Sequence, residues 1–244
     1  MIKFIIKRLI LCIIVIFLVS LFAFSIMQIL PGCPARLALG TEAPQEAVDA
    51  LRIQLNLDKP IATQYLLWIG NALQGDLGYS ITYNRPIVLM LKERLPRTLG
   101  IGLPALLISV VVGIAFGILS AVKRGTKTDQ FVTLFSTIGV GTPEFWLGIF
   151  GIYLFAIELK ILPIQGYVSP SVDFGQYIYR AVLPVLSLSV TLVASIARQT
   201  RSNMLEVINQ EYIRTARAYG IAERSVLLKY ALKNALIPVI TIIA

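Results

Sequence analysis

The 244-residue sequence contains no histidine. Imidazole is the commonest catalytic base and metal ligand, so its absence excludes an HExxH zinc site and a serine nucleophile activated by histidine. The sequence also lacks a Gly-x-x-x-x-Gly-Lys-Ser/Thr loop, so we expect no ATP site of that kind. Cys12 lies well inside an apolar run and Cys33 in the Pro-Gly-Cys-Pro stretch that ends it, which favours neither a disulfide nor a metal site. We predict no enzymatic activity, metal or cofactor.

Charged residues are scarce: they make up 14% of the chain, against 57% hydrophobic residues. A soluble domain carries about a quarter charged residues. The apolar residues gather in long uncharged runs at 9–35, 98–122 and 181–197, and in a run at 130–157 that only Glu144 interrupts. Because a membrane-spanning helix needs roughly 20 predominantly apolar residues, these runs predict an all-α integral membrane protein with four spans.

The last apolar run, 234–244, has only 11 residues. As a helix it would measure about 16 Å, roughly half of the hydrocarbon thickness. A chain that ended there would leave unpaired carbonyl groups in lipid, which is costly. We therefore expect this run to begin a fifth span, with the C-terminal spans missing from the sequence.

The distribution of basic residues predicts a cytoplasmic N-terminus. With that orientation, the inside segments 1–8, 123–129 and 198–233 hold three, three and seven Lys or Arg residues and four acidic residues in total. The outside segments 36–97 and 158–180 hold nine basic and eight acidic residues. Positive charge concentrates on the cytoplasmic side of membrane proteins. Topology thus explains the net charge of +9, and we expect no nucleic acid as a partner.

Polar residues between the first two runs predict a small structured segment outside the membrane. Helices are expected at Gln45–Asn56 and Gln64–Leu73, followed by a turn at 75–80. The chain is thus divided into a tail with the first span (1–35), an extracytoplasmic segment (36–97) and a core (98–244).

A short helix is predicted in the basic segment, between Asn209 as its N-cap and Gly220 as its left-handed C-terminal residue. Glu211 favours the positive N-terminal end of such a helix. These capping residues alone would be equally expected of a solvent-exposed loop helix with no functional role.

The same segment carries a resemblance. Residues 211–220 (EYIRTARAYG) and 226–241 (VLLKYALKNALIPVIT) resemble the signature of binding-protein-dependent importer permeases of the dipeptide, oligopeptide and nickel branch. The general signature begins Glu-Ala-Ala, where this chain has Arg214-Thr215-Ala216, a departure usual in the peptide branch. Further matching segments are LDKP at 57–60, GDLGYS at 75–80, RLPRT at 94–98, PEFWL at 143–147 and LP at 162–163.

This resemblance implies an ATP-binding-cassette (ABC) type I importer transmembrane domain in a bacterial inner membrane, with 98–244 as its incomplete permease core. Expected partners are a second homologous permease, two ATPase subunits that hydrolyse the ATP, an extracytoplasmic substrate-binding protein and membrane lipid. The substrate would be a peptide, nickel or a similar small solute. The residues expected to form the ATPase-coupling helix are Glu211, Arg214, Thr215, Ala216, Arg217 and Gly220.

Within the spans, Gly113 and Gly117 form a small-residue face, for which packing inside the chain is the simplest explanation. Pro143 is a packing candidate that also marks a kink. Glu144 is a functional candidate because ionisable residues at membrane depth usually are. The simpler explanation is an interfacial kink at Thr142-Pro143, with Glu144 in water near the cytoplasmic side. An ion-coupled carrier or channel is the alternative function, and only Glu144 has the character that it needs.

Overall fold

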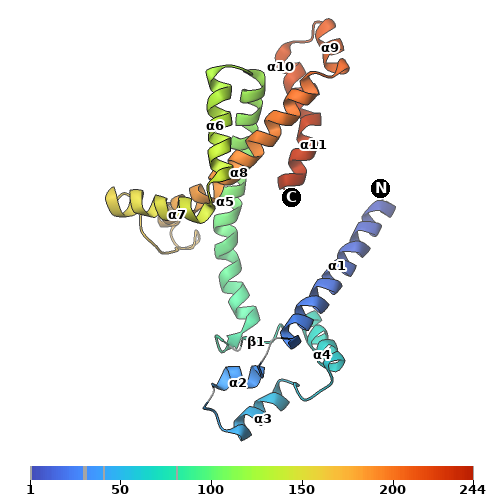
Figure 1. The fold of residues 1–244 in the computed structure, drawn as a ribbon, viewed down its shortest axis with the longest axis vertical. Helices are drawn as coiled ribbons and strands as arrows, with labels where there is room; N and C mark the ends of the chain where they lie inside the picture. The colour runs from blue at the N-terminus through green and yellow to red at the C-terminus, as the bar shows by residue number, and fades with distance from the viewer. Residues whose placement is uncertain (1, 30–31, 41, 81, 244) are drawn as a thin grey trace. The chain divides into compact units, whose positions relative to one another are not determined.

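In the computed structural model, residues 2–29, 32–40, 42–80 and 82–243 are described, and they form two compact units, Met1–Arg94 and Leu95–Ala244. Both units are helical apart from one two-stranded hairpin (Figure 1). Among the described residues, four single helices are long and apolar enough to cross a membrane, and one bent pair of helices would make a fifth span. The predicted all-α membrane class is confirmed.

The first unit begins with α1 (Ile2–Ile29), a continuous apolar helix of 28 residues. Three short helices follow: α2 (Pro34–Leu39), α3 (Gln45–Gln54) and α4 (Ile61–Leu73). The helices at α3 and α4 were predicted, whereas α2 was not. Helix α4 packs on α1 through aromatic rings: Tyr65 lies 5.4 Å from Phe24 between ring centroids, and its hydroxyl is 2.8 Å from Ser20 Oγ.

The predicted turn at 75–80 leads into a hairpin of β1 (Tyr79–Ser80) and β2 (Arg85–Pro86), paired antiparallel. Helix α5 (Ile87–Val122) starts directly after it, 11 residues before the apolar run. The helix therefore starts inside the segment expected to lie outside the membrane, and the boundary at 97 stays a prediction. Polar residues at 92–97 limit how far lipid can surround a helix, but Leu, Lys, Glu and Arg are good helix formers and do not end it.

The third apolar run does not form one straight span. It divides into α6 (Lys127–Gly141) and α7 (Glu144–Gly151), which continues as the π-helix η1 (Ile152–Glu158) and is bent by 99° from α6 (Figure 1). Proline disfavours the helical conformation of the residue before it, and Thr142 is extended at φ −97° and ψ 125°. Pro143 therefore lies at the break as the N-cap residue of α7.

The run at 181–197 lies inside a much longer helix, α8 (Phe174–Ile208). After it come α9 (Glu211–Ala218), α10 (Glu223–Ser225), the π-helix η2 (Val226–Ala231) and α11 (Leu232–Ile243). Residues 223–243 together are long and apolar enough for a span, so the helix that contains the 234–244 run begins 11 residues before that run.

Helices α5 and α8 approach closely where α5 carries glycine. A Cβ atom on Gly113 would lie 2.8 Å from Ile196 Cβ, and one on Gly117 would lie 2.8 Å from the backbone oxygen of Ala197. Nearby, the Ser109 and Ser189 hydroxyls donate across the same pair of helices, each at 3.3 Å. The small-residue face thus lies inside the chain, where it packs two spans together.

Gly117→Ala is expected to lower the apparent melting temperature of the detergent-purified protein, because the added methyl group meets a backbone carbonyl that cannot rotate away. Gly102→Ala on the same helix is the matched control, since a Cβ there has nothing within 4 Å. Removing this glycine favours the helix by up to about 1 kcal/mol and should not lower the melting temperature. Equal melting temperatures for the two variants would contradict the close contact.

Candidate functional site

Helix α9 follows α8 through a tight turn at Asn209 and Gln210. Gln210, extended at φ −73° and ψ 150°, is the N-cap residue. The prediction of Asn209 for that place was wrong, since Asn209 closes α8 and its side-chain amide donates to the Leu205 carbonyl at 2.7 Å. Gly220 has φ +74°, the left-handed conformation expected of it, and its N–H donates to Arg217 O at 2.9 Å.

One face of α9 is buried. Ile213 is fully buried and Ala216 is 6% exposed, and both belong to a core with Met204 of α8 and Ala121 of α5. The same core includes three residues from the following helices: Val226, Ala231 and Ala235. Ala216, one of the residues expected to form the coupling helix, is covered by its own chain. Helix α9 is thus anchored to α5, α8, η2 and α11 at once.

The Arg217 side chain is exposed and reaches along the chain to α10. Its Nε and Nη2 atoms donate to the two carboxylate oxygens of Glu223 at 3.1 and 2.7 Å. The Glu223 carboxylate raises the pKa of Arg217 above its ordinary value, chiefly through these hydrogen bonds. This bidentate pair fixes the loop that contains Gly220 and holds α9 against α10.

The opposite face of α9 is exposed. It consists of Arg214, Thr215, Ala218 and Tyr219, whose spacing places them side by side on a helix. Tyr219 is 82% exposed, and Arg214 forms an ion pair with the exposed Glu211 at 2.9 Å. We call these four residues the α9 outer face. Tyrosine and arginine are among the residue types that contribute most to the binding energy of protein interfaces, so this face is a candidate docking surface.

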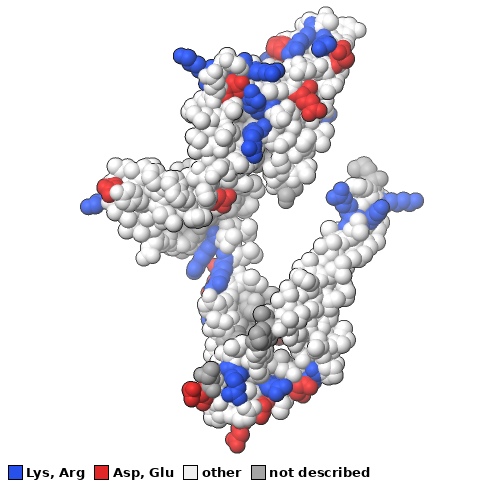
Figure 2. All heavy atoms as spheres, in the orientation of Figure 1, with Lys and Arg blue, Asp and Glu red and all other residues white. Residues whose placement is uncertain are grey.

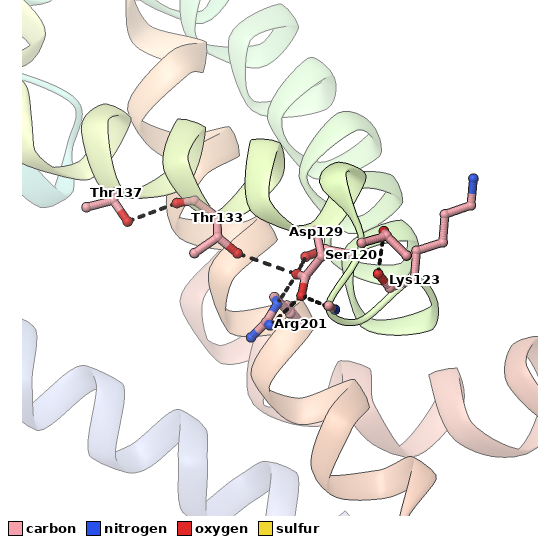
Figure 3. A network of polar contacts seen from close by, with 8 residues as sticks. Ser120, Lys123, Asp129, Thr133, Thr137 and Arg201 are labelled. Atoms are coloured by element: carbon pink, nitrogen blue, oxygen red, sulfur yellow. Dashed lines mark hydrogen bonds and ion pairs between the residues drawn. The ribbon is translucent and has the colours of Figure 1, made fainter.

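A partly buried ion pair joins α8 to the start of α6 (Figure 3). Asp129, in the first turn of α6, accepts from Arg201 Nε at 2.7 Å and from Arg201 Nη2 at 3.0 Å. Its carboxylate also accepts from Ser120 Oγ at 2.5 Å and from the Gly125 backbone N–H at 2.9 Å. We call these four residues the Asp129 network. Asp129 is 6% exposed, so this network fixes three helices near α9.

Neither Asp129 nor Arg201 was predicted as a site residue. The sequence does contain one signal for Asp129, which is the only acidic residue between Glu93 and Glu144 and is set among basic residues. The surrounding surface is basic: Figure 2 shows Lys and Arg side chains gathered at the end of the second unit that carries α9 and the 123–126 turn. That end presents a positive field to any partner.

The family of the protein follows from two matches to protein-family models. Residues 113–244 match the model of the binding-protein-dependent transport system inner membrane component, and residues 1–102 match the N-terminal model of the same membrane component. The chain belongs to this permease family. It is the permease subunit of an ABC importer, with an ABC type I transmembrane domain, and a multi-pass protein of the bacterial inner membrane. The predicted family is thereby confirmed.

The chain is similar in sequence to several curated permeases over nearly all of its 244 residues. It is 37% identical over 240 residues to a probable peptide ABC transporter permease, y4tP of Sinorhizobium fredii, covering 98% of this chain and 77% of that protein. It is 39% identical over 239 residues to a putative peptide transport system permease of Brucella suis, covering 98% and 76%. It is 38% identical over 241 residues to the glutathione transport permease GsiC of Shigella flexneri, covering 99% and 76%.

Membership has three consequences. The family consists of transport permeases and is not an enzyme family. Its members work with ATPase and substrate-binding partners in general. Nothing in the family match or the relatives supports the alternative of an ion-coupled carrier or channel.

Proposed function

We propose that this permease imports short peptides, paired with a second homologous permease and two ATPase subunits, and that α9 is the helix on which an ATPase docks. The observation that carries the coupling role is the division of α9 into two faces. Its inner residues Ile213 and Ala216 are locked to the spans, while Arg214 and Tyr219 remain exposed. A force applied to the outer face would therefore move α8 and α11.

Orientation and substrate complete the proposal. A cytoplasmic N-terminus would put the basic α9 end on the ATPase side, as the positive-inside rule favours. The relatives that carry a substrate in their names are permeases for peptides or glutathione, itself a peptide, which favours a peptide over nickel. The binding protein would deliver the peptide to the opposite end of the second unit.

The proposal is tested by ATP-driven uptake. The complex is purified from its native locus with its partners, reconstituted into proteoliposomes and supplied with labelled dipeptide, glutathione or nickel. We expect peptide uptake that requires ATP and the binding protein, and no nickel uptake. A preparation without ATPase subunits would contradict the assembly, whereas uptake of nickel but not peptide would contradict the substrate.

A further inference from the structure

The second unit contains a pocket of about 540 Å³ that the coupling role does not use. Its walls come from α5, the first turns of α7, the 163–166 loop and the first half of α8. It lies away from α9, because the 15 residues of α6, about 22 Å of helix, separate Glu144 from the 123–126 turn.

Glu144 stands in the first turn of α7, immediately after the 99° bend, and it lines this pocket. Its side chain is exposed, and it has no ion-pair partner within 4.0 Å among the residues that the structure describes. A carboxylate within an otherwise apolar run is costly in a membrane unless it meets water or a cation. The bend places this carboxylate at the pocket wall.

Arg180 lies on the α8 side of the same pocket. Its Nη1 donates to the Gln165 carbonyl at 3.2 Å, while its Nε is buried without an acceptor among the described residues. The loop is shaped around this guanidinium: Gly166 has φ +116°, and a Cβ there would overlap Arg180 Nη1. A guanidinium has five N–H donors, so one hydrogen bond leaves it free to bind an anion.

Glu144 and Arg180 share one pocket without forming an ion pair with each other. Between them the wall is mainly apolar, with Ile101, Leu183 and Leu188. Arg180 holds the loop through the Gln165 carbonyl, and this role does not require Glu144 in the same pocket. Two separated charges of opposite sign across an apolar wall are complementary to a small solute that carries both an ammonium and a carboxylate.

We propose that this pocket is a zwitterion-binding station on the import path, in which Glu144 binds the terminal ammonium and Arg180 the terminal carboxylate of a short peptide. The proposal rests on the peptide-import function above. The volume falls within the range of roughly 300–1,000 Å³ typical of small-molecule sites, which suits a short peptide. The apolar wall tolerates varied side chains, so the two ends provide recognition.

The test is equilibrium binding to the purified permease–ATPase complex without its binding protein. Labelled Ala-Ala is competed with Ala-Ala, with the N-acetylated dipeptide and with the C-terminal amide. In the unmodified complex, blocking either end should weaken binding about tenfold, the usual effect of losing one charge-assisted hydrogen-bond partner. Glu144→Gln should abolish only the preference for Ala-Ala over the N-acetylated dipeptide. Arg180→Gln should abolish only the preference for Ala-Ala over the C-terminal amide.

Glu158→Gln and Lys160→Gln are matched controls, because both residues lie near this region but outside the pocket lining, and both variants should discriminate as the unmodified complex does. Retention of the ATPase subunits checks assembly. If the complex with Arg180→Gln fails to assemble, the Glu144→Gln variant still tests the proposal, since Glu144 has no side-chain partner among the described residues to lose.

The zwitterion site would be overturned if Glu144→Gln still preferred Ala-Ala over the N-acetylated dipeptide as the unmodified complex does. It would also be overturned if the unmodified complex showed no saturable binding. Peptide uptake that persists with either result leaves the proposed function standing. Conversely, selective zwitterion binding without peptide uptake would support the site and overturn peptide import as the function.

Discussion

Asp129→Asn is expected to destabilise the permease by about 2 kcal/mol, because it removes the charged partner of an ion pair whose carboxylate is buried and whose guanidinium is partly buried. The carboxylate accepts four hydrogen bonds of 3.0 Å or less, two of them from Arg201. The amide has one oxygen and one N–H₂ group, so it cannot accept all four. It would also leave Arg201 facing an N–H₂ donor without a counter-charge. The measured quantity is the apparent melting temperature in mild detergent.

The double variant Asp129→Asn/Arg201→Gln separates charge from packing. With both charges removed, no uncompensated guanidinium remains, so the double variant should be more stable than Asp129→Asn alone. Glu211→Gln, which breaks the exposed pair with Arg214, is the matched control and should leave the melting temperature unchanged. A melting temperature for Asp129→Asn equal to that of the unmodified protein would contradict a structural role for the network.

The sequence predicted those parts of the fold that local patterns control. Apolar runs marked α1, α5 and α8, and amphipathic periodicity marked α3 and α4. Boundaries were less certain because a helix continues through polar residues after it leaves the lipid, as α5 and α8 do at 87–97 and 198–208. Thr142-Pro143 indicated a kink, but its angle of 99° depends on what α6 and α7 pack against.

The candidate site shows the same division between local and tertiary information. The left-handed Gly220 followed from one residue type at a helix end. The partner of Asp129 could not be predicted, because Arg201 lies 72 residues away in the sequence and reaches it only through the packing of α6 on α8. The burial of Ala216 was missed for a similar reason: the α9 sequence does not state which of its faces meets the spans.

That burial determines how the coupling role should be tested. A bulky replacement of Ala216 would disturb the core beneath α9, so lost transport would not distinguish docking from misfolding. Arg214 and Tyr219 belong to the α9 outer face and make no contact with that core. Replacing them tests docking without removing any buried side chain.

The double variant Arg214→Ala/Tyr219→Ala is expected to reduce ATP-driven uptake and ATPase co-purification more than tenfold, since arginine and tyrosine dominate the energy of many protein interfaces. Its melting temperature should match that of the unmodified permease, because both side chains are exposed. Ala216→Leu should instead lower stability and uptake together, because an added side chain has no room in the core. Full uptake by the double variant would show that α9 only packs the spans and that the ATPase docks elsewhere.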